Sequence, residues 1–215
     1  MELSLKKRPH DFRCYPGMIS RTGEVMNVQR KPPWPEAVAR MLLQPDLRRD
    51  AFHEWRRRLT GEPALPAGPI RTVLVICHGN ICRSPFAERR LAHYSPDLEV
   101  KSAGLLTKAG SPAAPGAIRT ARRFGVDLGD HAARSLEPEL LRWADLIVGM
   151  QGRHAAQLSR IWGVASDKIR LLGDFLPSPP HAISDPWGEN DDVFAAAFDR
   201  IEDAVRRLAA ALESR

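Results

Sequence analysis

The strongest constraint on the fold is an apolar strand that ends in a cysteine. Residues 70–85 read IRTVLVICHGNICRSP, in which a β-branched run stops at Cys77 and Arg83-Ser84-Pro85 opens a helix. A connection this short must curl, so the backbone N–H groups of residues 78–83 converge in front of the positive end of the helix. The pattern therefore predicts that an oxyanion such as phosphate binds in this loop.

The residue types in the loop suit a thiolate that attacks phosphorus. Cys77 and Arg83 are separated by five residues, and the planar fork of an arginine matches two phosphoryl oxygens better than a lysine does. The helix end and the guanidinium favour the thiolate, which is the nucleophilic form of cysteine. Ser84 is placed to donate a hydrogen bond to the sulfur, and Gly79 and Asn80 tolerate the positive φ of a tight loop.

An isolated Cys-x5-Arg can also be an ordinary turn after a buried cysteine, but a longer stretch of sequence argues against that reading. The string VICHGNICRSPFAE resembles the signature of the low molecular weight protein tyrosine phosphatases at nearly every position. The resemblance implies that Cys77 is the nucleophile and that Arg83 holds the phosphate. The remaining loop residues that it assigns to phosphate binding are His78, Gly79, Asn80, Ile81, Cys82 and Ser84.

Further segments follow in the order of that family, so the resemblance covers about residues 70–215. They are SAG at 102–104, HAARSL at 131–136, DLIVGM at 145–150 and LLGDF at 171–175. The resemblance implies that Ser102 and His131 brace Asn80. A strained loop needs such support.

A second chemical element is the Asp185-Pro186-Trp187 tripeptide. An aryl or alkyl oxygen leaves phosphorus poorly without a proton, so a carboxyl group has to face the nucleophile. Alone, an Asp-Pro pair is a turn; the resemblance makes Asp185 the general acid and Trp187 a wall of the substrate cleft, with core packing as the alternative for Trp187. The chain has Trp187-Gly188 where many members carry two aromatics, which predicts a more open pocket.

The order of expected elements favours the α/β class. Strands are expected at 70–77, 98–102, 145–150 and 168–172, and helices at 83–94, 112–124, 138–143, 153–162 and 191–212. This alternation predicts a three-layer, doubly wound sheet of four parallel strands with helices on both faces. Ligands of such sheets bind at the carboxyl ends of the strands, where Cys77 is placed.

Residues 1–69 form a basic N-terminal extension outside the resemblance, and residues 70–215 form the predicted phosphatase domain. The extension holds 13 Lys and Arg against 8 Asp and Glu, which is most of the net charge of +6. Its spacing predicts an extended part through Lys31, helices near 36–42 and 47–59, and a linker at 61–69. We expect the stripe of Phe52, Trp55 and Leu59 to pack on the phosphatase domain. The alternative is that this basic helix docks nucleic acid, another partner or an anionic surface.

Composition excludes several classes of protein. Three cysteines make no disulfide framework, and no Cys/His spacing suggests a metal site, so neither a metal nor a cofactor is expected. No run of eighteen apolar residues and no secretion signal is present, so we expect a soluble, cytoplasmic protein without a membrane span. Cys82 has two interpretations: a small residue at the helix entry, or the partner of Cys77 in a reversible disulfide.

Related activities remain as alternatives to phosphotyrosine hydrolysis. Arsenate reductases on this fold relay electrons through further downstream cysteines, and none follows Cys82. A protein-arginine phosphatase of the family has threonine where Ile81 lies, and an apolar residue suits an aryl ester better. A phosphate-binding interaction module without catalysis is the non-enzyme alternative. The expected partner is a phosphotyrosine protein, with a bacterial tyrosine kinase as one candidate, and nucleic acid is not expected.

Overall fold

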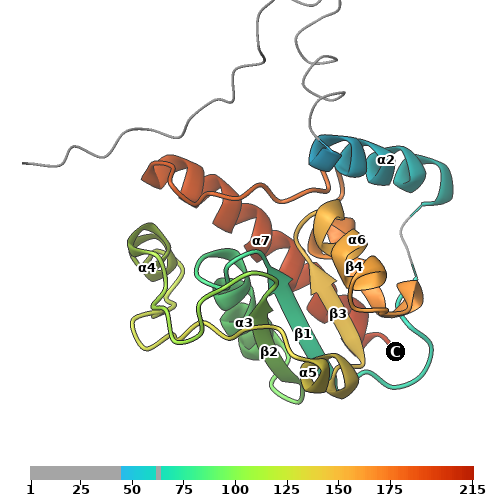
Figure 1. The fold of residues 1–215 in the computed structure, drawn as a ribbon, viewed down its shortest axis with the longest axis horizontal. Coiled ribbons are helices and arrows are strands. Elements are labelled where there is room, and N and C mark those ends of the chain that lie inside the picture. Colours follow the sequence, from blue (N-terminus) through green and yellow to red (C-terminus); the bar gives the residue numbers. More distant parts are fainter. Residues whose placement is uncertain (1–44, 62–63) are drawn as a thin grey trace, which may run out of the picture. The chain divides into compact units, whose positions relative to one another are not determined.

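The computed structural model describes residues 45–61 and 64–215, and its centre is a sheet of four parallel strands (Figure 1). The strands are β1 (Thr72–Cys77), β2 (Glu99–Gly104), β3 (Leu146–Gly149) and β4 (Ile169–Leu171), in the spatial order β2-β1-β3-β4. Cys77 pairs with Gly104, so the carboxyl ends of β1 and β2 lie level. The predicted parallel sheet is confirmed.

Helices follow the strands as the sequence predicted, with small shifts at their ends. They are α3 (Arg83–Tyr94), α4 (Pro115–Arg122), α5 (Pro138–Trp143), α6 (Gly152–Arg160) and α7 (Asp191–Glu213), with short 3-10 turns η1 (Ser166–Lys168) and η2 (Leu172–Phe175). The start of α4 was predicted three residues too early. Residues 112–114 are extended because Pro112 bridges to Ala132 and the N–H of Ala114 donates to the carbonyl of Ile81 at 2.8 Å.

Successive residues of β1 face two different apolar layers. Val73 and Val75 belong to a core shared with α3, α4 and α7, whereas Leu74 and Ile76 belong to one shared with α5, α6 and β4. This alternation follows from the two-residue period of a strand. Both faces of the sheet are therefore covered, which holds β1 rigidly and fixes where Cys77 ends.

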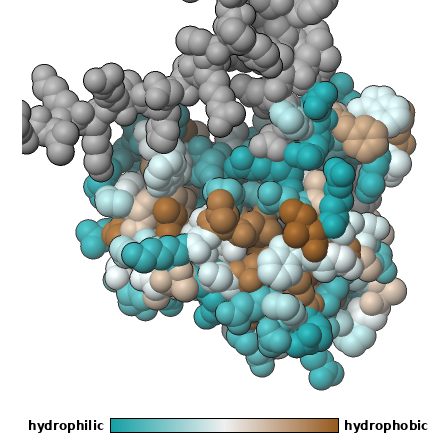
Figure 2. All heavy atoms as spheres, viewed as in Figure 1, coloured by the Kyte–Doolittle hydropathy of each residue, from teal (hydrophilic) through white to brown (hydrophobic). Residues whose placement is uncertain are grey.

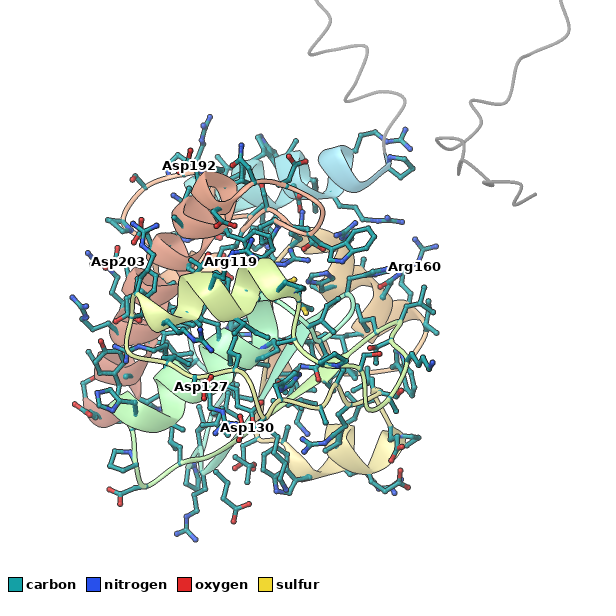
Figure 3. All side chains as sticks on the ribbon, turned by 90° about the vertical axis from the view of Figure 1, so that its left-hand side faces the viewer. Arg119, Asp127, Asp130, Arg160, Asp192 and Asp203 are labelled. Atoms are coloured by element: carbon teal, nitrogen blue, oxygen red, sulfur yellow. The ribbon has the colours of Figure 1, made fainter. Side chains whose placement is uncertain are left out.

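Ion pairs tie the helices of the first layer to one another. Arg90 of α3 pairs with Glu202 of α7 at 2.6 Å, and the same carboxylate accepts a 2.5 Å hydrogen bond from the hydroxyl of Tyr94. Arg119 of α4, labelled in Figure 3, pairs with Asp191 at the start of α7 at 2.6 Å. These contacts fix the position of α3, which follows the loop after Cys77.

The aromatic stripe predicted to be buried lies on helix α2 (Pro45–Thr60), and it is exposed. Phe52, Trp55 and Leu59 are 61%, 57% and 68% exposed, so the expectation that they pack on the phosphatase domain is wrong. Figure 2 shows apolar spheres among hydrophilic ones on this part of the surface. The helix contacts α6 and its neighbours through polar side chains instead, and Pro45 begins the helix because proline is tolerated in the first turn.

The predicted extended segment through Lys31 and the predicted helix near 36–42 lie outside the described residues. Residues 61 and 64–69, which follow α2, contain no helix or strand, and the linker at 61–69 stays a prediction. Within residues 45–61 and 64–215, none of the helices has the length and apolar character needed to cross a membrane.

Candidate active site

The loop between β1 and α3 surrounds the sulfur of Cys77 with hydrogen-bond donors. The N–H of Asn80 donates to Sγ at 3.2 Å, and Oγ of Ser84 lies 3.0 Å from it. Because Ser84 Oγ already accepts from Asn80 Nδ2 at 2.8 Å, its own proton is available to the sulfur. Both donors favour an anionic sulfur, and α3 begins at Arg83 directly behind it.

Asn80 holds the loop in its strained conformation. Its φ of 52° is positive, its side chain is fully buried, and Nδ2 also donates to Ser102 Oγ at 2.7 Å. Oδ1 accepts the N–H of Arg134 at 2.8 Å, and the ring Nε2 of His131 lies 2.7 Å from the carbonyl oxygen of Asn80. Ser102 in turn donates to Glu88 at 2.5 Å. The structure thus places Ser102 and His131 in contact with Asn80, as the family resemblance implied.

Gly104 allows the end of β2 to lie directly against the loop. A Cβ at this position would lie 3.0 Å from backbone atoms of His78, Gly79 and Asn80. The hydroxyl of Thr107, just beyond, donates to the carbonyl of Gly79 at 2.6 Å. The loop is therefore supported from the neighbouring strand as well as from its own side chains.

Arg83 is a buried cation at the centre of the site. It is 1% exposed, its Nη1 donates to Gln151 Oε1 at 2.9 Å and to the carbonyl of Ile183 at 3.0 Å, and Nη2 pairs with Asp185. Burial lowers the pKa of Arg83, while the charges of Cys77 and Asp185 raise it. Among the residues that the structure describes, Nε has no partner, although it is buried. A buried guanidinium with an unpartnered donor fits an oxyanion.

Asp185 and Trp187 line the pocket from the loop between η2 and α7. The Asp185 carboxylate is 29% exposed, accepts the N–H of Trp187 at 3.4 Å, and lies 3.8 Å from Arg153 Nη2. Trp187 is 66% exposed and lines the pocket, so the alternative of core packing for this side chain is wrong. A carboxyl group in this position can exchange a proton with a substrate oxygen.

The pocket has a volume of about 320 Å³, and it brings the predicted residues together with others that the sequence analysis missed. Predicted residues in its walls are Cys77, His78, Gly79, Ile81, Cys82, Asp185 and Trp187. Leu106, Thr107, Lys108 and Ser111 complete the wall and were not predicted. Their signal was topological: they follow β2, whose carboxyl end is adjacent to that of β1. Gln151 and Arg153 were missed too, although they follow β3 in the same way.

Two other titratable groups in this region, Cys82 and His154, are buried. Burial, with the charges of Asp185 and Cys77, raises the pKa of the Cys82 thiol to about 12, so this thiol remains protonated at neutral pH. His154 is fully buried and its Nδ1 accepts the N–H of Met150 at 3.1 Å. Burial and the nearby charge of Arg83 lower the pKa of His154 well below its usual value, so its ring is neutral.

Comparisons with known proteins agree on one family. The model of the family described as low molecular weight phosphotyrosine protein phosphatase matches residues 72–215. Low molecular weight protein-tyrosine-phosphatase Wzb of Escherichia coli K12 is 39% identical over 142 residues, which cover 66% of this chain and 95% of that protein. The crystal structure of the Erwinia amylovora tyrosine phosphatase amsI is 34% identical with a TM-score of 0.66, covering 71% of this chain and 99% of its own.

A solved structure with a different substrate is also similar. The YwlE arginine phosphatase of Geobacillus stearothermophilus is 33% identical to this chain, with a TM-score of 0.63, over 68% of this chain and 94% of its own. The solved structures similar to this chain therefore include phosphatases named for two different amino acids, tyrosine and arginine.

Proposed function

Because the chain belongs to the low molecular weight phosphotyrosine protein phosphatase family, we propose that it hydrolyses phosphotyrosine in proteins through a cysteinyl-phosphate intermediate. The observation that carries this proposal is the position of Arg83. Arg83 is the first residue of α3, directly after the Cys77 loop, and its buried guanidinium pairs with Asp185. The proposed nucleophile and proton donor both line the pocket, and the proposed phosphate-binding cation pairs with that donor.

In the first step, the Cys77 sulfur attacks phosphorus while the bond to the tyrosyl oxygen breaks. The loop amides and Arg83 bind the three equatorial oxygens, whose charge they stabilise in the transition state. Protonated Asp185 gives its proton to the departing phenolate, which leaves as tyrosine. The products of this step are a phosphorylated Cys77 and an ionised Asp185.

In the second step, water replaces the thiolate. Asp185, now a carboxylate, takes a proton from water as the water oxygen attacks phosphorus, and the sulfur leaves as an anion. Ser84 Oγ and the N–H of Asn80 donate to that sulfur and stabilise it as it leaves. Inorganic phosphate is released, and Asp185 is protonated again for the next cycle.

The walls of the pocket favour an aryl ester over a phosphorylated guanidinium. Ile81 offers an apolar contact to an aromatic ring, and exposed Trp187 offers a face on which the ring can stack. Arginine phosphatase activity is the second candidate, because YwlE is similar over 68% of the chain. Arsenate reduction has less support, since no cysteine follows Cys82 to relay electrons. A phosphate-binding module without catalysis would not need the Asp185 carboxyl group.

Parallel assays on phosphotyrosine and phosphoarginine peptides test the proposal. Wild-type protein should release phosphate from phosphotyrosine with a kcat/KM at least roughly tenfold higher than from phosphoarginine. Cys77→Ser should abolish turnover and keep binding of inorganic phosphate, because the amides and Arg83 remain. A preference for phosphoarginine, or turnover by the Cys77→Ser variant, would contradict the proposal.

The compartment and the protein substrate are further parts of this proposal. A working thiolate needs reducing conditions, so we place the reaction in the cytoplasm. A bacterial tyrosine kinase is the protein substrate that we would test first. Capture of phosphorylated proteins by an Asp185→Ala variant, followed by their identification, tests both parts.

A further inference from the structure

Helix α2, which precedes the family match at residues 72–215, contacts two segments near Asp185: the loop that leads to it and the start of α6. The Glu54 carboxylate binds His181 in the loop that leads to Asp185. Asp50 binds the N–H of Gly152 at the start of α6, at 2.7 Å. In Figure 1, α2 lies beside α6. A helix that the family match does not cover is thus attached to the surroundings of the catalytic pocket.

The contact of Glu54 with His181 is bidentate. One carboxylate oxygen accepts the backbone N–H of His181, and the other lies 2.7 Å from its ring Nδ1. The side chains of His181 and Glu54 are only 8% and 17% exposed, so water competes little for these bonds. Hydrogen bonds to a charged group in such a place are stronger than those on an open surface.

Three residues separate His181 from Asp185, and the intervening chain is held at a second point. The N–H of Ile183 donates to the carbonyl of Met150 at 2.8 Å, and its own carbonyl accepts from Arg83 at 3.0 Å. The loop therefore meets the sheet at Ile183 and meets α2 at His181. These two attachments fix the direction in which the chain approaches Asp185.

A second attachment of α2 is at the start of α6. Gln151, the residue before α6, does not cap the helix with its side chain within the described part of the chain, and Asp50 of α2 supplies an acceptor at this positive end instead. Gly152 permits the approach, because a Cβ there would lie 3.0 Å from the Asp50 carboxylate and 3.1 Å from the carbonyl of Arg49. The next residue, Arg153, faces Asp185.

We propose that Glu54 is a positioning residue for the general acid: by binding His181 from α2, it holds the loop so that Asp185 lies over Cys77. The inference rests on the proposed function, in which Asp185 protonates the leaving group. Misplacing a catalytic group by about 1 Å can cost roughly 100-fold in rate, so a loop end that is no longer held weakens proton donation. The segment before residue 72 is then part of the active site's support.

The test compares leaving groups in full-length variants. Phenyl phosphate needs a proton on its leaving oxygen, and p-nitrophenyl phosphate needs it far less. Glu54→Ala should lower kcat/KM for phenyl phosphate by roughly 10- to 100-fold, with a change of only a few-fold for p-nitrophenyl phosphate. Glu54→Gln keeps an acceptor for the N–H of His181 and should restore most of the loss. Arg58→Gln, an exposed change on the same helix, should match the wild type.

A double-mutant cycle separates this inference from the proposed function. Asp185→Asn alone should lower the phenyl phosphate rate, and Glu54→Ala should add little in that background, because the two residues act on one proton transfer. If Asp185→Asn leaves the phenyl phosphate rate unchanged, the proposed role of Asp185 is wrong. If Asp185→Asn slows the reaction but Glu54→Ala slows both substrates equally, or slows them equally in both backgrounds, the positioning role of Glu54 is wrong.

Amide hydrogen exchange gives a readout that does not depend on activity. In Glu54→Ala, the amide of His181 should exchange faster, whereas the amide of Ile183, bound to Met150, should keep its protection. Unchanged exchange at His181 would overturn the inference. A thermal unfolding curve on the same sample establishes that each variant is folded at the assay temperature.

Discussion

Replacing Ser84 by alanine removes a side-chain hydroxyl that lies 3.0 Å from the sulfur of Cys77. Asn80 Nδ2 keeps Ser102 Oγ as an acceptor, so the loop retains most of its hydrogen bonds. A hydrogen bond to a charged group contributes about 1.5–3 kcal/mol. At about 1.4 kcal/mol per factor of ten, its loss should slow the affected step roughly 10- to 150-fold.

The affected step is the hydrolysis of the intermediate, in which the sulfur leaves as an anion. Phosphorylation of Cys77 should continue while its hydrolysis becomes rate-limiting. Stopped-flow measurement with p-nitrophenyl phosphate should then show a burst of nitrophenol close to one equivalent per protein, followed by slow turnover. Mass spectrometry of acid-quenched samples should show phosphate on Cys77.

Ser95 provides a matched control, because it follows the last residue of α3, the helix in whose first turn Ser84 lies. Ser95 is 6% exposed, and its hydroxyl has no partner among the described residues. Ser95→Ala should therefore keep the wild-type rate without a burst. If Ser84→Ala retains the wild-type kcat, or loses rate without accumulating phosphorylated Cys77, the role assigned to this hydroxyl is wrong.

Four further outcomes are expected. Gly104→Ala should destabilise the fold by about 1–3 kcal/mol and weaken inhibition by inorganic phosphate, because its Cβ meets the loop backbone at 3.0 Å; unchanged phosphate inhibition would contradict this. Glu202→Gln should lower the free energy of unfolding by about 2 kcal/mol in urea titrations, since Arg90 loses its ion pair. Burial lowers the pKa of His154, so below about pH 6.5 the unfolded chain binds a proton that the folded one does not, and the free energy of unfolding decreases as the solution is made more acidic; His154→Asn should flatten that slope. At pH 7, iodoacetamide should label Cys77 and spare Cys82, whose pKa is raised to about 12, as peptide mass spectrometry would show.

The regulatory disulfide between Cys77 and Cys82 stays a prediction. Both thiols are free and buried in this structure, and a protonated Cys82 attacks oxidised sulfur slowly. Peptide mapping after mild peroxide would detect the link if it forms.

Local patterns were sufficient to place the strand, the loop and the helix around Cys77. The apolar run predicted β1, and α3 begins and ends at the residues expected, because its limits depend on nearby chain signals. The pairing of Ser102 and His131 with Asn80 followed from resemblance rather than from spacing, since they lie 22 and 51 positions after it in the chain. The start of α4 was misjudged because residues 112–114 are used to support the loop.

The aromatic stripe of α2 shows why a periodic pattern can mislead. Phe52, Trp55 and Leu59 fall on one face of the helix, and burial of that face was the natural expectation. The opposite face carries Asp50 and Glu54, whose partners Gly152 and His181 lie 102 and 127 positions further along the chain. No local sequence pattern predicts such partners, because an acidic side chain on a helix is usually solvated.

The sequence alone determined the order of the elements and the chemistry of the loop, because periodicity, turn residues and the Cys77-to-Arg83 spacing act over a few positions. Only the tertiary structure decided how Asp185 is held, which side of α2 faces the domain, and that Leu106 and Lys108 line the pocket. Those features depend on which chain segments the parallel sheet brings together at its carboxyl edge. Contacts between segments that are far apart in the sequence determine these features, so a local sequence pattern does not predict them.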